Sequence, residues 1–269
     1  MTQSEPSFNL WTEPWITLER PDGSLARAGI EETLLRATEF RAIYDPSPLA
    51  IVGVHRLLTA ILQDVFDPQR PADLRRLWES DRFPETEVHA FGKRYAHRFD
   101  LFSEDMPFLQ SADLCRNAPK RGTKTVTYLT PQIPAGSAVT HYRHGMAEDN
   151  IFCPACAARG LLTIPAFATS GGAGIRPSIN GVPPIYVIPG GRRLVESLAA
   201  SLVLPSYQPK AASTSEDGVW WRREPIVKHR DVVQEVSYLH SLTFPARRVR
   251  LHPEPLDETC SRCGQQNGW

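Results

Sequence analysis

The most constraining feature of the sequence is a pair of C-x-x-C motifs, Cys153-x-x-Cys156 and Cys260-x-x-Cys263, which are separated by 103 residues. A two-residue spacer allows both thiolates of one motif to converge on one ion, and two motifs complete the tetrahedral sulfur set of a structural Zn(II) site. Four thiolates leave no open coordination position, so the role expected for the zinc is structural. Such a site would tie the segment around Cys260 to the segment around Cys153.

Two other uses of these cysteines stay open. A redox C-x-x-C usually follows a strand in a β-α-β unit, and the sequence predicts no such unit before Cys153. Disulfides are disfavoured in the cytoplasm, which is the location that we expect. The N-terminal sequence MTQSEPSFNLW lacks the basic and apolar regions of a secretory signal, and no uninterrupted apolar run reaches the roughly 18 to 20 residues of a membrane span. The fifth cysteine, Cys115, is expected to be a small buried residue.

Local patterns predict an α+β fold, an irregular mixed domain with small sheets, several helices and a structural zinc site. The clearest helix covers 48–66, with Ser47 as N-cap, Pro48 at the first position and Asp67-Pro68 at its end. The 24 prolines against 17 glycines indicate many irregular connections. The other predicted elements are strands over 10–18, 25–28 and 185–188, and helices over 85–99, 153–168 (interrupted near Pro165) and 194–202.

The charge balance is neutral overall but uneven along the chain. The sequence has 30 basic and 30 acidic side chains. Residues 106–193, however, hold nine bases and three acids. A basic stretch of this kind either faces phosphate or solvates a loop-rich region, and charge alone does not separate the two. The bases at Lys93, Arg94 and Arg98, in the helix predicted before it, are expected to form a solvated face.

Motifs for catalysis are missing from the sequence. It contains no H-E-x-x-H, no G-x-S-x-G and no P-loop, so we expect no enzyme. The cluster His141-Tyr142-Arg143-His144 on its own is typical of a surface loop. Gly171-Gly172-Ala173-Gly174 lacks the spacing of a dinucleotide-binding fingerprint. It serves either to bring backbone groups close to a ligand, with Arg176 adding charge, or as a hinge.

Several landmarks, in order, resemble one family, the large subunit (CasA) of the type I-E CRISPR surveillance complex Cascade. Each motif is weak alone, whereas their order and combination are specific, and the resemblance spans essentially the whole chain. The landmarks are Asn9-Leu10 with Glu13-Pro14-Trp15-Ile16; Asp100-Leu101-Phe102 with Pro107-Phe108-Leu109-Gln110; Cys153 to Ala168 followed by Gly172-Ala173-Gly174-Ile175-Arg176 and Gly181-Val182-Pro183-Pro184; and Cys260-Ser261-Arg262-Cys263-Gly264-Gln265-Gln266.

The resemblance implies a non-catalytic subunit that binds the 5′ end of the crRNA and contacts the protospacer-adjacent motif of target double-stranded DNA. Its partners would be the other Cascade subunits and, in the family, a recruited helicase-nuclease. Gly172, Ala173 and Gly174 correspond to the family's glycine loop, which approaches the minor groove, and Arg176 takes the position of a nearby lysine. The minor groove shows few groups that distinguish one base pair from another, so contacts made there by the backbone would tolerate several motif sequences. Counting back from Cys153 places Tyr142 and His144 on the family's aromatic and polar RNA contacts.

In domain terms, the resemblance assigns residues 1–269 to one Cascade large-subunit N-terminal domain, with a mobile loop region over 117–150. Members of the family continue past the second cysteine pair into a wedge that splits the duplex, a later basic DNA contact and a four-helix bundle. These parts would be absent from this sequence. We therefore expect docking on the crRNA and the partner subunits more than opening of the DNA duplex. The alternative function is a zinc-stapled scaffold protein that binds only protein partners.

Overall fold

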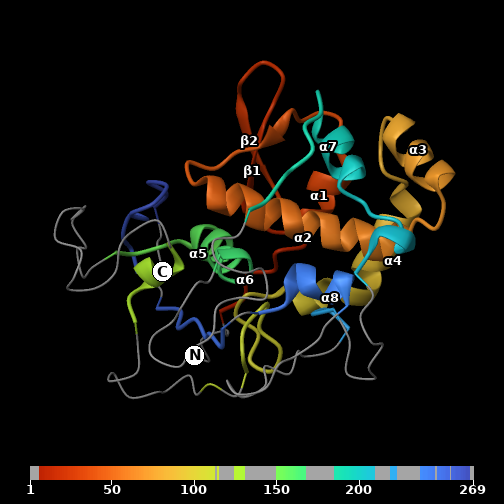
Figure 1. Ribbon diagram of the computed structural model, residues 1–269. Coiled ribbons are helices and arrows are strands. Elements are labelled where there is room, and N and C mark those ends of the chain that lie inside the picture. Colours follow the sequence, from red (N-terminus) through yellow and green to blue (C-terminus); the bar gives the residue numbers. More distant parts are fainter. Residues whose placement is uncertain are drawn as a thin grey trace.

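The fold is described from a computed structural model, which places residues 6–112, 114, 124–130, 150–167, 185–209, 219–222, 237–245, 247–254 and 256–266. Helices dominate these ranges, together with one three-stranded sheet, so the expected mixture of helices and small strands is confirmed at that level. Helix α2 (Pro48–Phe66) crosses the middle of the molecule (Figure 1). On one side of it lie β1 (Ile16–Glu19), β2 (Leu25–Ala28) and α7 (Leu194–Ala200), and on the other lie α5 (Pro154–Leu161), α6 (Thr163–Phe167) and α8 (Tyr238–Thr243).

The sheet is antiparallel with the order β2-β1-β3, formed by β1 (Ile16–Glu19), β2 (Leu25–Ala28) and β3 (Ala42–Ile43). The return strand over 25–28 is confirmed, whereas the strand expected over 10–18 begins only at Ile16. The carbonyl of Asn9 accepts hydrogen bonds from the N–H groups of Thr12 and Glu13, at 3.2 and 2.8 Å, which folds the preceding segment into turns. Local side-chain and turn bonding has therefore replaced the strand pattern.

Helix α2 (Pro48–Phe66) has the predicted bounds. Pro48 occupies the first position, and Ser47 is the N-cap residue, although its side chain makes no capping bond. The helix ends where Asp67 adopts φ 34° and donates its N–H to the Gln63 carbonyl. It is long and apolar enough to span a bilayer, yet most of its residues are buried against other elements, which is the property of a core helix in a globular domain.

The other predicted helices form with altered bounds, and the predicted strand over 185–188 is wrong. The helix over 85–99 becomes α-helical and then 3-10, while the helix after Cys153 breaks at Leu162 and not near Pro165. Ile185 and Val187 are highly exposed and pair with no strand in the described chain. The helices are α1 (Ile30–Leu35), α3 (Pro71–Glu79), α4 (Glu85–Tyr95), η1 (Ala96–Phe99), η3 (Val126–Leu129), α5 (Pro154–Leu161), α6 (Thr163–Phe167), α7 (Leu194–Ala200), η4 (Pro205–Tyr207) and α8 (Tyr238–Thr243).

Polar residues of the first two landmark motifs hold the core together. Asn9 donates from Nδ2 to the Ala96 carbonyl at 3.0 Å, and the Asp100 carboxylate accepts from the Phe102 N–H at 2.8 Å. Gln110 donates to the Leu101 carbonyl at 2.7 Å and accepts from the Leu251 N–H at 2.7 Å. The bonds of Asn9 and Gln110 to Ala96 and Leu251 satisfy backbone groups of distant segments, and that of Asp100 satisfies a local one, so the motif residues have a structural role here.

Arg98 contradicts the expectation that it belongs to a solvated face with Lys93 and Arg94. Its side chain is buried and donates from Nη2 to the Trp220 carbonyl at 3.0 Å. Lys93 and Arg94 are exposed, as expected. Arg98 therefore joins the segment after α4 to residues 219–222.

The buried His55 on α2 is predicted to make the stability of the fold depend on pH. It is 6% exposed, its Nε2 lies 2.8 Å from Ser201 Oγ, and burial lowers its pKa from 6.5 to about 4. The unfolded chain therefore binds a proton at His55 more tightly than the folded chain does. The contribution of neutral His55 to the stability of the fold is complete above about pH 6.5 and is lost as the pH falls towards 4.

We expect wild-type protein to lose about 2 kcal/mol more stability than His55→Gln between pH 6.5 and 5, measured by urea unfolding. The control is His97→Gln, which makes the same change at an exposed histidine and should keep the wild-type dependence. Equal pH dependence of the wild type and His55→Gln would contradict the assignment.

Candidate metal centre

The first cysteine pair lies at the start of α5. Cys153 is the N-cap residue, with an extended backbone, and Pro154 occupies the first helical position. One helical turn then carries Cys156 round to the same side as Cys153. Both cysteines are buried within the continuous apolar core. The local sequence C-P-x-C thus starts a helix and presents two sulfurs together.

The second pair lies in a tight loop that docks on the segment before α5. Ser261 donates its N–H to the Ile151 carbonyl at 2.8 Å, and Ile151 donates its N–H to Ser261 Oγ at 3.0 Å. Gly264 has φ 72°, a conformation that favours glycine, and its N–H bonds to the Cys260 carbonyl at 2.9 Å. These bonds fix the loop so that Cys260 and Cys263 face the first pair.

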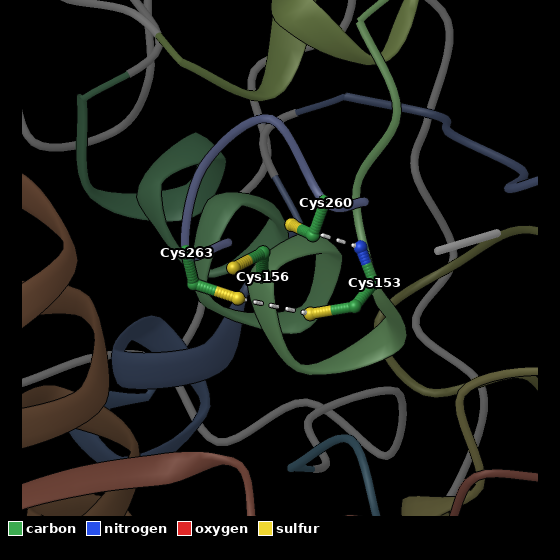
Figure 2. A group of neighbouring side chains, drawn as sticks. All are labelled: Cys153, Cys156, Cys260 and Cys263. Atoms are coloured by element: carbon green, nitrogen blue, oxygen red, sulfur yellow. Dashed lines mark hydrogen bonds between the residues drawn. The ribbon is translucent and has the colours of Figure 1, made fainter. Parts of the chain in front are cut away.

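The four sulfurs converge, as Figure 2 shows. Their Sγ atoms all lie within 4.8 Å of one another, and the Sγ atoms of Cys153 and Cys263 are 3.7 Å apart. The edge of a tetrahedron with Zn–S bonds of about 2.3 Å is about 3.8 Å, so the sulfur set fits a four-thiolate ion. The four cysteines form no disulfides. The pairs predicted to meet across 103 residues are therefore adjacent in space.

Hydrogen bonds among the thiols make them unequal acids. Bonds from Cys153 and Cys156 hold the pKa of the Cys260 thiol well below its usual range. Hydrogen bonds with Cys153 and Cys260, together with burial, raise the pKa of Cys156. The bond with Cys156 lowers the pKa of Cys153, but Cys260 and burial outweigh it and raise that pKa to about 11. A metal that binds all four sulfurs must therefore displace protons, so acid will weaken its binding.

Three charged residues around the sulfurs were not predicted. Arg159 donates from Nη2 to Cys156 Sγ at 3.0 Å, and its Nε lies 3.0 Å from Asp45 Oδ2. Arg262 donates from Nη2 to Asp45 Oδ1 at 2.8 Å. Each arginine lies within three residues of a cysteine of the set, which is a signal that the sequence did offer. Asp45 is more than a hundred residues away from every one of these cysteines in the sequence and offered none.

The predicted nucleic-acid contacts lie outside the described residues. This holds for the glycine-loop group Gly172, Ala173, Gly174 and Arg176, and for the RNA-contact pair Tyr142 and His144. It holds also for Cys115 and for most of the 117–150 region. These assignments stay predictions.

The chain matches known proteins over nearly its whole length. The sequence model of the family described as CRISPR-associated protein Cse1 (CRISPR_cse1) matches residues 9–266, a range that includes all four cysteines. The chain belongs to the Cse1 family. A curated relative, the CRISPR-associated protein CasA/Cse1 of Thermus thermophilus, is 34% identical over 260 residues, which is 92% of this chain and 49% of the relative.

Solved structures of Cse1 proteins share the fold. A crystal structure of Thermus thermophilus CasA is similar with a TM-score of 0.69 at 29% identity, covering 98% of this chain and 52% of that one. A chain of a structure described as "CRISPR RNA-guided surveillance complex" is similar in fold, with a TM-score of 0.62 at 23% identity over 81% of this chain and 47% of that one. The chain thus spans about half the length of the Cse1 relatives that it matches.

Proposed function

We propose that the chain acts as a non-catalytic subunit of a type I-E CRISPR RNA-guided surveillance complex in the cytoplasm. It would bind the 5′ end of the crRNA and contact the protospacer-adjacent motif of target double-stranded DNA, alongside the other Cascade subunits and, at a later stage, a helicase-nuclease. The observation that carries the proposal is the Cse1 family match over 9–266. The likeness to a chain of an RNA-guided surveillance complex supports it at the level of fold.

We further propose Zn(II) as the ion of the candidate metal centre, with a structural role. Four thiolate donors match the preference of zinc, and a closed sulfur set leaves no position for a substrate. When bound, the ion would supply a cross-link between Cys153 and Cys156 on one side and Cys260 and Cys263 on the other. The chain's own residues prepare that cross-link, because the Ile151–Ser261 bonds already align the two segments.

The charge of the nucleic-acid face would come mainly from bases outside the described ranges. Within 106–193, the structure describes Lys124, Arg159, Arg192 and Arg193. Arg159 is buried, Arg193 pairs with Asp81 at 3.1 Å, and Lys124 lies over the Tyr128 ring. Arg192 pairs with Glu196 at 3.8 Å. The remaining five bases, Arg116, Lys120, Arg121, Arg143 and Arg176, are therefore the main candidates for phosphate contacts.

The DNA contact is tested by the double variant Gly172→Asp/Arg176→Ala in a complex assembled with the other subunits and crRNA. A carboxylate placed where backbone approaches the minor groove repels phosphate, and the loss of Arg176 removes one positive charge. We expect at least about tenfold weaker binding to a duplex carrying the adjacent motif, with the log–log salt slope reduced by about 1, measured by gel shift.

The matched control for the DNA contact is Gly190→Asp/Arg192→Ala, which makes the same chemical changes at exposed positions. A Cβ at Gly190 meets no atom within 4 Å, so the control should fold normally. Unchanged DNA affinity and salt slope in Gly172→Asp/Arg176→Ala would refute the glycine-loop contact. Retained binding of the protein partners under the same conditions would favour the scaffold function.

The RNA contact is tested by Tyr142→Ala and His144→Ala. Stacking of one base on an aromatic side chain contributes about 1–3 kcal/mol, so Tyr142→Ala should weaken association with the crRNA-loaded complex roughly 5- to 150-fold. Fluorescence anisotropy with labelled crRNA measures the change. Tyr207→Ala removes a highly exposed tyrosine and should leave the affinity unchanged. Equal affinities of Tyr142→Ala and Tyr207→Ala would refute the stacking contact.

A further inference from the structure

One arginine next to the sulfurs donates hydrogen bonds from both terminal nitrogens of its guanidinium and forms an ion pair through its Nε. Arg159 Nη2 donates to Cys156 Sγ at 3.0 Å, and Nη1 donates to the Trp15 carbonyl at 3.0 Å and to Thr17 Oγ1 at 2.9 Å. Its Nε lies 3.0 Å from Asp45 Oδ2. The planar guanidinium of arginine can contact three such groups at once, whereas the ammonium of lysine carries its donors on a single nitrogen. Arg159 therefore connects a sulfur of the metal centre to β1 and to Asp45.

The Asp45 carboxylate joins the two cysteine pairs to the segment after β3. Its Oδ2 faces Arg159, three residues after Cys156, and its Oδ1 accepts from Arg262, which lies between Cys260 and Cys263. Oδ1 also accepts from the Ser47 N–H at 2.8 Å, at the start of α2. The side chains of Asp45 and Arg159 are 2% and 6% exposed. One buried carboxylate thus holds one arginine from each cysteine segment.

The charges of this group suit a thiolate-rich ion. A divalent ion with four thiolates carries a net charge of about −2, and two arginines with one aspartate contribute about +1. A buried ion pair by itself adds little to the free energy of folding, so stability alone does not explain why these three charged residues are buried here. The 3.0 Å bond from Arg159 to Cys156 Sγ supplies one, because it places positive charge on a sulfur that must stay ionised to hold a metal.

We propose that Arg159 is a positioning residue of the metal centre, and that the Asp45–Arg159–Arg262 group couples metal binding to the packing of β1 and of the segment after β3. The inference rests on the metal site of the proposed function and is independent of nucleic-acid binding. Coupling of this kind is reciprocal. Metal binding tightens the contacts of Arg159 with Trp15, Thr17 and Asp45, and loss of those contacts lowers the affinity for the metal.

The first measurement is the Zn(II) affinity of the whole chain, by competition with a chromophoric chelator. Substitution of residues that orient metal ligands typically costs 10- to 100-fold in affinity, and we expect this range for Arg159→Ala, Arg159→Lys and Asp45→Asn. Asp45→Asn keeps the side-chain shape, so it tests the proposal even if Arg159→Ala fails to fold. Arg41→Ala, which removes an exposed ion pair with Glu19 on the same sheet, is the control. Its affinity should stay within about threefold of the wild type.

The second measurement separates positioning from general stabilisation. In Co(II)-loaded protein, loss of the N–H···S bond to Cys156 should move the thiolate-to-cobalt charge-transfer band to longer wavelength in Arg159→Ala, but not in Arg41→Ala. Hydrogen exchange of wild-type protein should slow on Zn(II) binding in peptides covering 15–18 and 43–48, which contain the bonded Tyr44 and Ser47 amides. In Arg159→Ala this zinc-dependent slowing should be absent.

The outcomes are distinguishable. A wild-type chain that binds no Zn(II) overturns the metal site and the coupling together. A wild type that binds one Zn(II), with Arg159→Ala within threefold of its affinity, overturns the coupling alone. Zinc-dependent protection confined to 150–161 and 259–266 also overturns the coupling, because Arg159 and Asp45 would then transmit nothing to the sheet.

Discussion

Replacement of the second cysteine pair by serine, Cys260→Ser/Cys263→Ser, is expected to abolish zinc binding and to lower the melting temperature by roughly 10 °C. Two of the four ligands are lost, and a two-thiolate remnant cannot close the tetrahedron. If free zinc is about 1,000 times its Kd, binding to the folded chain contributes about 4 kcal/mol. For a chain of this size each kcal/mol shifts the melting temperature by about 2–4 °C.

Elemental analysis and differential scanning calorimetry check this expectation. Wild-type protein should hold one zinc per chain, and excess chelator should lower its melting temperature to that of the variant. Cys115→Ser serves as the matched control, because it removes a cysteine outside the four-sulfur set and should leave the zinc content unchanged. Full zinc content in Cys260→Ser/Cys263→Ser would refute the four-thiolate site.

Replacement of Trp15 by alanine is expected to cost about 3–5 kcal/mol of folding free energy. Trp15 is fully buried, and its Nε1 donates to the Leu10 carbonyl at 2.8 Å. The alanine variant would leave a cavity in the core and remove the indole donor from the Leu10 carbonyl.

Trp78→Ala is the matched control for Trp15→Ala. The Trp78 side chain lies on α3 and is 43% exposed, so its loss should cost about 1 kcal/mol or less. Chemical denaturation followed by circular dichroism measures both variants. A cost for Trp15→Ala no larger than that for Trp78→Ala would show that the Trp15 region does not anchor this core.

Elements with strong local signals could be predicted from the sequence. The bounds of α2 follow from Pro48 at its start and Asp67-Pro68 at its end, two signals that act within a few residues. The meeting of the four cysteines follows from their spacing and from the coordination chemistry of zinc, without knowledge of the path between them. In both cases a few residues determine the outcome.

Elements that depend on distant contacts could not be predicted. The segment 10–15 reads as a strand, yet beside its local turns Leu10 donates its N–H to the distant Phe99 carbonyl and accepts from the Ile30 N–H. The apolar run 185–188 reads as a strand, but no described strand lies beside it, and Ile185 is exposed. The ion pairs of Asp45 could not be predicted, because Arg159 and Arg262 are more than a hundred residues away in the sequence. Tertiary packing decides all three.

The central proposal is that this Cse1-family chain is a subunit of an RNA-guided surveillance complex. The most direct test is to purify the tagged full chain from cells that express the other subunits and a crRNA, and to sequence the RNA that co-elutes. We expect crRNA with its 5′ end intact, together with the partner subunits, and reduced recovery for Tyr142→Ala. Recovery of no crRNA above an untagged control would contradict the proposal.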